Sequence, residues 1–174
     1  MRSSVGRILW LGAWLILATP LVADSAPAAS AESDFDRIKA LAGTWTGTAG
    51  HAGQKGGDAT VVYRLTSGGS AVLETHFPGT SHEMVTVYHL DQGDLVLTHY
   101  CAMGNQPSMK RVPSTDPGTV VFDFRGGANV EDGGMHMHAA TLKFVDADHL
   151  ESTWTTWDAG QATDASYFSL TRTK

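Results

Sequence analysis

The fold of this chain is decided by residues 83–102, which read EMVTVYHLDQGDLVLTHYCA. Apolar and polar side chains alternate on both sides of the turn sequence Gln92-Gly93, and this pattern predicts a β-hairpin. Because strand side chains alternate between two faces, the turn also fixes which residues lie opposite one another. The expected pairs are Leu90 with Leu95, Tyr88 with Leu97, Thr86 with His99, and Met84 with Cys101.

The same alternation runs through most of the chain after a short predicted helix, Ser33–Leu41. Val, Thr, Tyr, Phe and Trp are frequent in the alternating segments, and Gly, Asp or Pro separates them. The expected strands are roughly 43–49, 59–67, 70–77, 83–91, 94–102, 108–113, 119–126, 135–145, 149–158 and 164–173. No second helical pattern interrupts them, which excludes a parallel βαβ sheet. We therefore predict an all-β fold, a roughly ten-stranded antiparallel up-and-down barrel, since closure removes exposed sheet edges.

The charged residues indicate which face of each strand points inward. Lys143 shares a face with Met135 and Met137, so His136, His138 and Leu142 are expected inside. The turn at Asp146-Ala147-Asp148 pairs Phe144 with Leu150, Leu142 with Ser152, Ala140 with Trp154 and His138 with Thr156. The predicted lumen is Trp45, Val61, Tyr63, Leu65, Met84, Tyr88, Leu90, Leu95, Leu97, His99, Cys101, Phe122, Phe124, His136, His138, Leu142, Phe144, Leu150, Trp154, Phe168 and Leu170.

Residues 1–31 have the pattern of a secretory signal peptide. Arg2 and Arg7 precede the apolar run Ile8–Leu17, and Ala29-Ser30-Ala31 offers a cleavage site of small residues. Cleavage after Ala23 is the competing site, and an uncleaved anchor is the alternative. The apolar run is shorter than the roughly 20 residues of a membrane-spanning helix. We thus expect a domain at 32–174 that is periplasmic or secreted, with no stable membrane span after cleavage.

The composition narrows the classes of partner. The 174 residues include 12 Lys and Arg against 18 Asp and Glu, a formal net charge of −6, which disfavours nucleic acid as a partner. The single cysteine, Cys101, excludes an internal disulfide. This thiol is either buried and inert or a ligand or reactive group.

The segment Leu41-Ala42-Gly43-Thr44-Trp45-Thr46-Gly47 resembles the opening of the calycin superfamily, the lipocalin-like and fatty-acid-binding-like barrels. The helix, the Gly-x-Trp-x-Gly motif and about ten strands look most like the compact ten-stranded branch, which includes the haem-binding nitrobindin-type barrels. Residues 82–89 and 99–107 look like the central block of a bacterial family of exported lipocalin-like proteins with no assigned function. This resemblance covers roughly residues 33–174.

Nitrobindin-type barrels ligate haem through a histidine near the end of the chain. Here no histidine follows His149, and the last strand offers Tyr167 instead. The resemblance therefore implies a ligand-binding barrel rather than a particular ligand. Haem or a transition metal is a conceivable cofactor that we do not favour.

Several polar residues are candidates for a site in the lumen. Inward imidazoles at His99, His136 and His138 have the residue types of a metal site for zinc, copper or iron. The alternative is that these histidines hydrogen-bond to lumen waters and neighbouring hydroxyls, as buried polar groups usually do. Glu74, His82 and Glu83 flank the loop Phe77-Pro78-Gly79-Thr80, where His82 and Glu83 provide either an acid–base pair or loop caps.

The leading functional hypothesis is an exported, noncatalytic carrier or sensor of a small apolar or amphipathic molecule. Asn105 and Gln106 either read a polar ligand group at the rim or form an ordinary turn before Pro107. The expected ligand-binding residues are Tyr63, Met84, Tyr88, His99, Cys101, Asn105, Gln106, His136, His138 and Trp154. The alternatives are an enzyme that uses His99 or the His82–Glu83 pair on a lumen-bound substrate, and a filled barrel with a purely interaction role.

Overall fold

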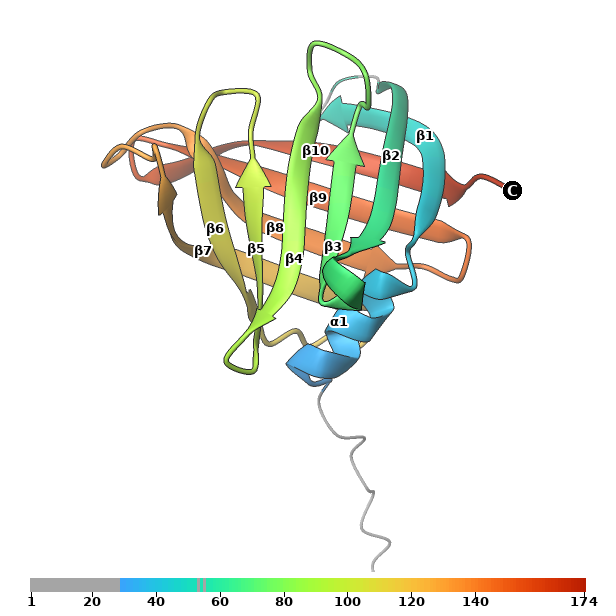
Figure 1. The fold of residues 1–174 in the computed structure, drawn as a ribbon. Helices are drawn as coiled ribbons and strands as arrows, with labels where there is room; N and C mark the ends of the chain where they lie inside the picture. Colours follow the sequence, from blue (N-terminus) through green and yellow to red (C-terminus); the bar gives the residue numbers. More distant parts are fainter. Residues whose placement is uncertain (1–28, 53, 55) are drawn as a thin grey trace, which may run out of the picture.

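A computed structural model describes residues 29–174 except 53 and 55, so most of the predicted signal peptide lies outside the described residues (Figure 1). A short helix precedes ten strands, as predicted. The elements are α1 (Ala31–Lys39), β1 (Gly43–His51), β2 (Gly57–Thr66), the 3-10 turn η1 (Ser67–Gly69), β3 (Ala71–His76), β4 (Met84–Asp91), β5 (Asp94–Tyr100), β6 (Gln106–Val112), β7 (Thr119–Ala128), β8 (His136–Phe144), β9 (His149–Asp158) and β10 (Gln161–Arg172).

The ten strands form a closed antiparallel barrel in which each strand pairs with its neighbours in the chain. β10 returns to β1 and closes the sheet, with pairs that run from Trp45↔Arg172 to His51↔Ser166. Figure 1 shows the sheet wrapped around one interior, with α1 at one end. The predicted fold class, an all-β, ten-stranded up-and-down barrel with a short N-terminal helix, is confirmed.

The predicted hairpin registers hold in the barrel except for two pairs. Met84 and Cys101 lie beyond the β4–β5 ladder, whose last pair is Val85 with Tyr100, and Thr156 pairs with Met137 rather than with His138. β4 and β5 pair Leu90 with Leu95, Tyr88 with Leu97 and Thr86 with His99. Gln92 and Gly93 both take the left-handed backbone conformation, with φ of 51° and 90°, as a two-residue turn of this kind requires. β8 and β9 pair Phe144 with Leu150, Leu142 with Ser152 and Ala140 with Trp154, but their register shifts between Met137 and Ala139.

Helix α1 fills the barrel end from which β1 starts. Phe35, Ile38 and Leu41 are buried against the barrel core, and the Trp45 indole donates a 2.8 Å hydrogen bond from Nε1 to the Leu41 carbonyl. The helix begins two residues before the predicted cap Ser33, because the Ser30 hydroxyl accepts from the Ser33 backbone N–H at 3.1 Å. Most of the predicted lumen is buried above this helix, including Tyr88, Leu97 and Phe122.

Five apolar residues of the predicted lumen are less buried than expected, and one of them is Met84 at the start of β4. Leu65 and Leu90 are 40% and 37% exposed, because each lies one residue from the end of its strand, beyond the packed interior. Phe144 ends β8 and is only half-buried beneath the Arg37 guanidinium, 4.1 Å from its ring centroid. Phe124 is also half-buried, with its ring stacked 5.0 Å from that of His138.

A buried carboxylate attaches α1 to the barrel wall. Asp34 is 1% exposed, and its two oxygens accept from Arg37 Nη1 at 3.0 Å and from Arg111 Nε of β6 at 2.5 Å. Charge-assisted bonds of this kind are stronger than neutral ones. The helix is therefore fixed to the sheet by charge as well as by its apolar face.

We predict that Asp34→Ala lowers the free energy of unfolding by about 2 kcal/mol, because both guanidinium groups lose a charged acceptor. Asp36→Ala is the matched control, since Asp36 lies on the same helix, pairs with Lys39 and is 74% exposed. Its cost should stay below about 0.5 kcal/mol. Urea unfolding followed by circular dichroism measures both, and equal losses would show that the buried pair has no special role.

Candidate functional site

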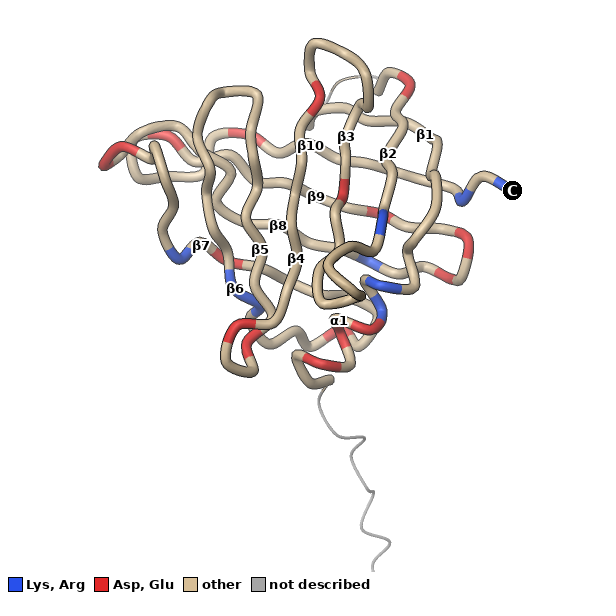
Figure 2. The backbone as a smooth tube through the Cα atoms, in the orientation of Figure 1, with Lys and Arg blue, Asp and Glu red and all other residues tan. Residues whose placement is uncertain are grey.

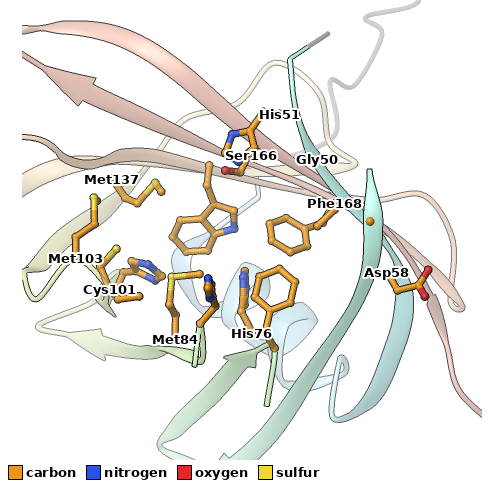
Figure 3. A pocket seen from close by; sticks show the side chains of 17 residues that line it. Gly50, His51, Asp58, His76, Met84, Cys101, Met103, Met137, Ser166 and Phe168 are labelled. Carbon is orange, nitrogen blue, oxygen red and sulfur yellow. The ribbon is translucent and has the colours of Figure 1, made fainter. Parts of the chain in front are cut away.

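The barrel interior opens into a cavity of about 430 Å³ at the end opposite α1 (Figure 3). The end of β1, the start of β2 and the loops after β3 and β5 form its rim. Its wall is mostly apolar. The lining residues are Ala49, Gly50, His51, Gly57, Asp58, His76, Phe77, His82, Met84, His99, Cys101, Ala102, Met103, Met137, Trp154, Ser166 and Phe168.

A buried carboxylate, Glu74, lies next to the cavity residue His76 in the middle of the sheet. Figure 2 shows most charged residues at loops and strand ends, whereas β3 carries an acidic residue within the strand. Glu74 is fully buried and accepts hydrogen bonds from Tyr63 Oη at 2.5 Å and from Tyr88 Oη at 2.6 Å. These tyrosines come from β2 and β4, the two neighbours of β3, so three adjacent strands meet at one carboxylate.

His76 connects this carboxylate with the cavity. Its Nε2 lies 2.8 Å from Glu74 Oε1, an ion-pair distance, although this nitrogen is not aligned for a hydrogen bond with any of the described residues. The ring packs edge-on against Phe168 and Trp154, with centroids 4.7 and 5.6 Å away. Since Nε2 is turned toward Glu74, Nδ1 is the ring nitrogen that can reach a molecule in the cavity.

Burial and charge act in opposite directions on the pKa of Glu74 and in the same direction on the pKa of its two tyrosine partners. Burial opposes ionisation of Glu74, but attraction from the close His76 ring and the hydrogen bonds from the two tyrosines lower the pKa of Glu74 below its usual value. Burial and the neighbouring carboxylate raise the pKa of Tyr63 and of Tyr88 well above 10. Glu74 is therefore a carboxylate at neutral pH, and both tyrosines are neutral donors.

His99 is the second imidazole in the cavity wall. Its Nδ1 lies 2.9 Å from Thr86 Oγ1, which leaves Nε2 as the nitrogen available to a ligand. Burial, with a smaller electrostatic effect of the nearby His76, lowers the pKa of His99 from 6.5 to about 4. Nε2 of His99 and Nε1 of Trp154 are both buried and have no hydrogen-bond partner among the described residues. We call these two atoms the cavity nitrogens.

The structure brings together about half of the predicted site residues. Met84, His99, Cys101 and Trp154 line the cavity, and His82 lies at its exposed rim. Tyr63 and Tyr88 do not line it, because their hydroxyls are bound to Glu74. Cys101 is a buried free thiol.

Asn105 and Gln106 stabilise loops and lie outside the cavity wall. Asn105 Nδ2 donates to the Met135 carbonyl at 2.8 Å, and Gln106 Nε2 donates to the Gly104 carbonyl at 3.0 Å. Gln106 also accepts from Asn129 Nδ2 at 2.7 Å. These bonds are those of a turn, as the alternative interpretation of this segment predicted.

His136 and His138 do not reach the cavity, because the shifted register in β8 reverses the order of faces. Met137 pairs with Thr156 and lines the cavity, so the adjacent His136, paired with Trp157, points away from it. His138 stacks on Trp157, with ring centroids 3.7 Å apart, and its Nδ1 lies 2.9 Å from His136 Nε2. Burial and repulsion from His136 lower the pKa of His138.

The expected convergence of His99, His136 and His138 is therefore not found. Across residues 29–174, leaving aside 53 and 55, no group of three His, Cys, Asp or Glu side chains is arranged to hold a metal ion.

His82 and Glu83 do not form a pair with each other. The Glu83 carboxylate accepts from the Gly79 backbone N–H at 2.5 Å and so closes the loop between β3 and β4. His82 Nδ1 lies 3.4 Å from Ser81 Oγ. Glu74 was expected beside this loop, but it lies inside the barrel, because it alternates with Leu73 and Thr75 on the same face as Val72 and His76.

Sequence reasoning missed His76, the histidine most closely involved with the buried carboxylate. A signal for it was present, since His76 pairs with Val61 on one side and with Met84 on the other, and both were expected to face the lumen. Met137 was also missed, and the register shift that turns it inward has no clear mark in the sequence.

The fold and the cavity define the class of protein, a closed ten-stranded antiparallel β-barrel with a cavity at one end. In structure it is similar to a protein of unknown function from the DUF3598 family of Nostoc punctiforme, with a TM-score of 0.53 and 11% sequence identity over 78% of this chain. The chain spans about half of that protein, 48% of its length. At this identity the likeness shows the fold alone. The sequence matches no protein-family model and no curated protein.

We predict that the burial of neutral His99 makes stability depend on pH. The His99 imidazole binds a proton near pH 6.5 in the unfolded chain but only near pH 4 in the folded chain. The free energy of unfolding therefore has its full value above pH 6.5 and falls as the pH drops toward 4. The contribution is about 3 kcal/mol. Urea unfolding at pH 7 and pH 4 should show a smaller loss in His99→Gln than in the wild type. His89→Gln, on the outer face of β4, should keep the wild-type loss, and an equal loss in His99→Gln would contradict the assignment.

Proposed function

We propose that this protein is a carrier or sensor that binds a small apolar or amphipathic molecule in the barrel cavity. The observation that carries the proposal is a mostly apolar cavity of about 430 Å³ whose wall includes buried polar nitrogens that lack partners among the described residues. Small-molecule sites usually combine apolar walls with a few polar groups, in volumes of roughly 300–1,000 Å³. A filled barrel with only an interaction role fits this open volume less well.

The wall indicates how such a ligand lies. Met84, Met137 and Phe168 offer apolar surface, and burial of ligand surface against them contributes roughly 25 cal/mol per Å². The cavity nitrogens of His99 and Trp154 supply hydrogen bonds to a polar end. A ligand that pairs with them removes the cost of buried polar groups left without partners. We therefore expect molecules with one hydrogen-bonding end and an apolar body.

The lipocalin-like resemblance and the N-terminal signal pattern support the same proposal, as an exported calycin-like binding protein. The helices described here include none that is long and apolar enough to cross a membrane.

We predict that Met137→Trp abolishes ligand binding, because the larger side chain enters the cavity. Met135→Trp is the matched control: Met135 lies two residues earlier and is 50% exposed, so binding should be unchanged. Titration with a panel of fatty acids and aromatic amphiphiles measures binding through quenching of tryptophan fluorescence, with Trp154 in the cavity wall as the reporter.

The two methionine variants should also keep the wild-type circular dichroism spectrum. Equal affinity in Met137→Trp and wild type would place the ligand outside the barrel. Failure of every amphiphile in the panel to bind the wild type would contradict the proposed function.

We further propose that the exported chain is cleaved after Ala23 rather than after Ala31. Cleavage after Ala31 removes Ser30, whose hydroxyl caps α1, and also Ala31, which packs against the core. Loss of a serine cap costs about 1 kcal/mol. The intact mass of chain purified from the periplasm or medium of an expressing bacterium should correspond to a start at Asp24. A start at Glu32, or retention of all residues, would contradict this.

A further inference from the structure

We propose that the cavity also catalyses proton transfer, in which His76 removes a proton from the carbon next to the carbonyl group of a bound ketone while the cavity nitrogens bind the carbonyl oxygen. This activity rests on the proposed function, because the substrate occupies the same cavity. Such a reaction is an enolisation or a double-bond shift, and it needs only a base and donors to oxygen.

His76 and Glu74 have the arrangement of a base and the group that orients it. Glu74 Oε1 lies 2.8 Å from Nε2, which favours the tautomer with the ring proton on Nε2 and leaves the lone pair on Nδ1 for the cavity. Such contacts are often poorly aligned before substrate binds. When Nδ1 takes a proton, the imidazolium that forms lies against a full negative charge.

The two tyrosines keep that negative charge in place. Glu74 is buried, and a buried carboxyl group without partners would be protonated and could not stabilise a cation. Hydrogen bonds from Tyr63 and Tyr88 hold it as a carboxylate. Glu74 is therefore a positioning residue. The need to keep it ionised explains why three adjacent strands place polar side chains in an otherwise apolar interior.

The cavity nitrogens lie on the same wall as this base. The centroid of His76 is 6.5 Å from that of His99 and 5.6 Å from that of Trp154, and the His99 and Trp154 rings are 4.8 Å apart. His99 is neutral at pH 7, and the tautomer in which Nδ1 accepts from Thr86 carries its proton on Nε2. Nε2–H of His99 and Nε1–H of Trp154 are then two donors for one oxygen.

The step balances without an added oxidant or cofactor. The α C–H bond breaks, its proton moves to His76 Nδ1, and its electron pair forms the C=C bond of an enolate. The negative charge on oxygen is stabilised by the two donors in a mostly apolar cavity, where such bonds are stronger than in water. His76 then returns the proton to the same carbon or, in a conjugated substrate, to another.

The test follows deuterium incorporation into 2-tetralone, a bicyclic aromatic ketone, by proton NMR in D₂O with the full barrel domain. Wild type should exchange the α-hydrogens in a saturable manner and faster than free imidazole at the same concentration. His76→Gln should lower the exchange rate by about 100-fold, the usual contribution of a general base. His89→Gln, on the outer face of β4, should leave it unchanged.

Glu74→Gln tests the positioning role by separating binding from turnover. Loss of the carboxylate should lower the exchange rate at saturating 2-tetralone but leave the affinity for 2-tetralone, read from tryptophan quenching, as in the wild type, because Glu74 contacts His76 and the two tyrosines and does not line the cavity. Loss of structure alone would weaken binding as well. If either substitution prevents folding, the wild-type rate decides: after subtraction of the buffer rate, it must exceed that of free imidazole at the same concentration.

The outcomes separate this inference from the proposed function. If 2-tetralone quenches the cavity tryptophan but exchanges no faster than with imidazole, or if folded His76→Gln retains the full rate, the catalytic inference is wrong and binding stands. If 2-tetralone does not bind, the ketone class is wrong, and the amphiphile panel alone then decides the proposed function.

Discussion

The buried negative charge of Glu74 is the constraint on which the interior of this barrel depends. Removal of a carboxylate from water costs several kcal/mol unless charge and hydrogen bonds replace the solvent. β2 and β4 each supply a tyrosine hydroxyl, and β3 supplies His76 two residues further along. A shift of either neighbouring strand by one residue would turn its tyrosine outward and leave the charge without that partner. The carboxylate thus specifies the register of three strands as well as occupying the core.

This charge also marks where the packed part of the barrel ends. On the α1 side, Trp45, Tyr63, Tyr88 and Phe122 fill the interior completely. On the other side, His76 and His99 border open space, together with Trp154 and Phe168. An apolar boundary would favour collapse of the neighbouring side chains into that space. The contacts of His76 with Glu74 and of His99 with Thr86 fix both imidazoles in the wall and so oppose such collapse.

The sequence predicted the barrel because the period of two is unbroken in most strands and the turns are short. The register from Gln92-Gly93 placed Thr86 opposite His99, the contact that now orients His99. The site was predicted less well for two reasons. The register shift after Met137 reverses the faces of His136 and His138, and nothing in the local pattern marks it. His76 was missed because Glu74, two residues before it, was assigned to a loop. A carboxylate can lie inside the barrel because tyrosines from neighbouring strands donate hydrogen bonds to it, and the local sequence does not show these partners.

The same geometry determines which molecules the cavity should reject. A purely apolar molecule that fills it gains the hydrophobic contribution of Met84, Met137 and Phe168 but leaves the cavity nitrogens of His99 and Trp154, which are already shielded from water, without a hydrogen-bond partner. Each polar group left unpaired in this way costs about 1–3 kcal/mol. A site built to hydrogen-bond discriminates strongly against analogues that lack the matching group, whereas one methylene more or less changes little. Selectivity should therefore follow the polar end of the ligand, with wide tolerance in its apolar body.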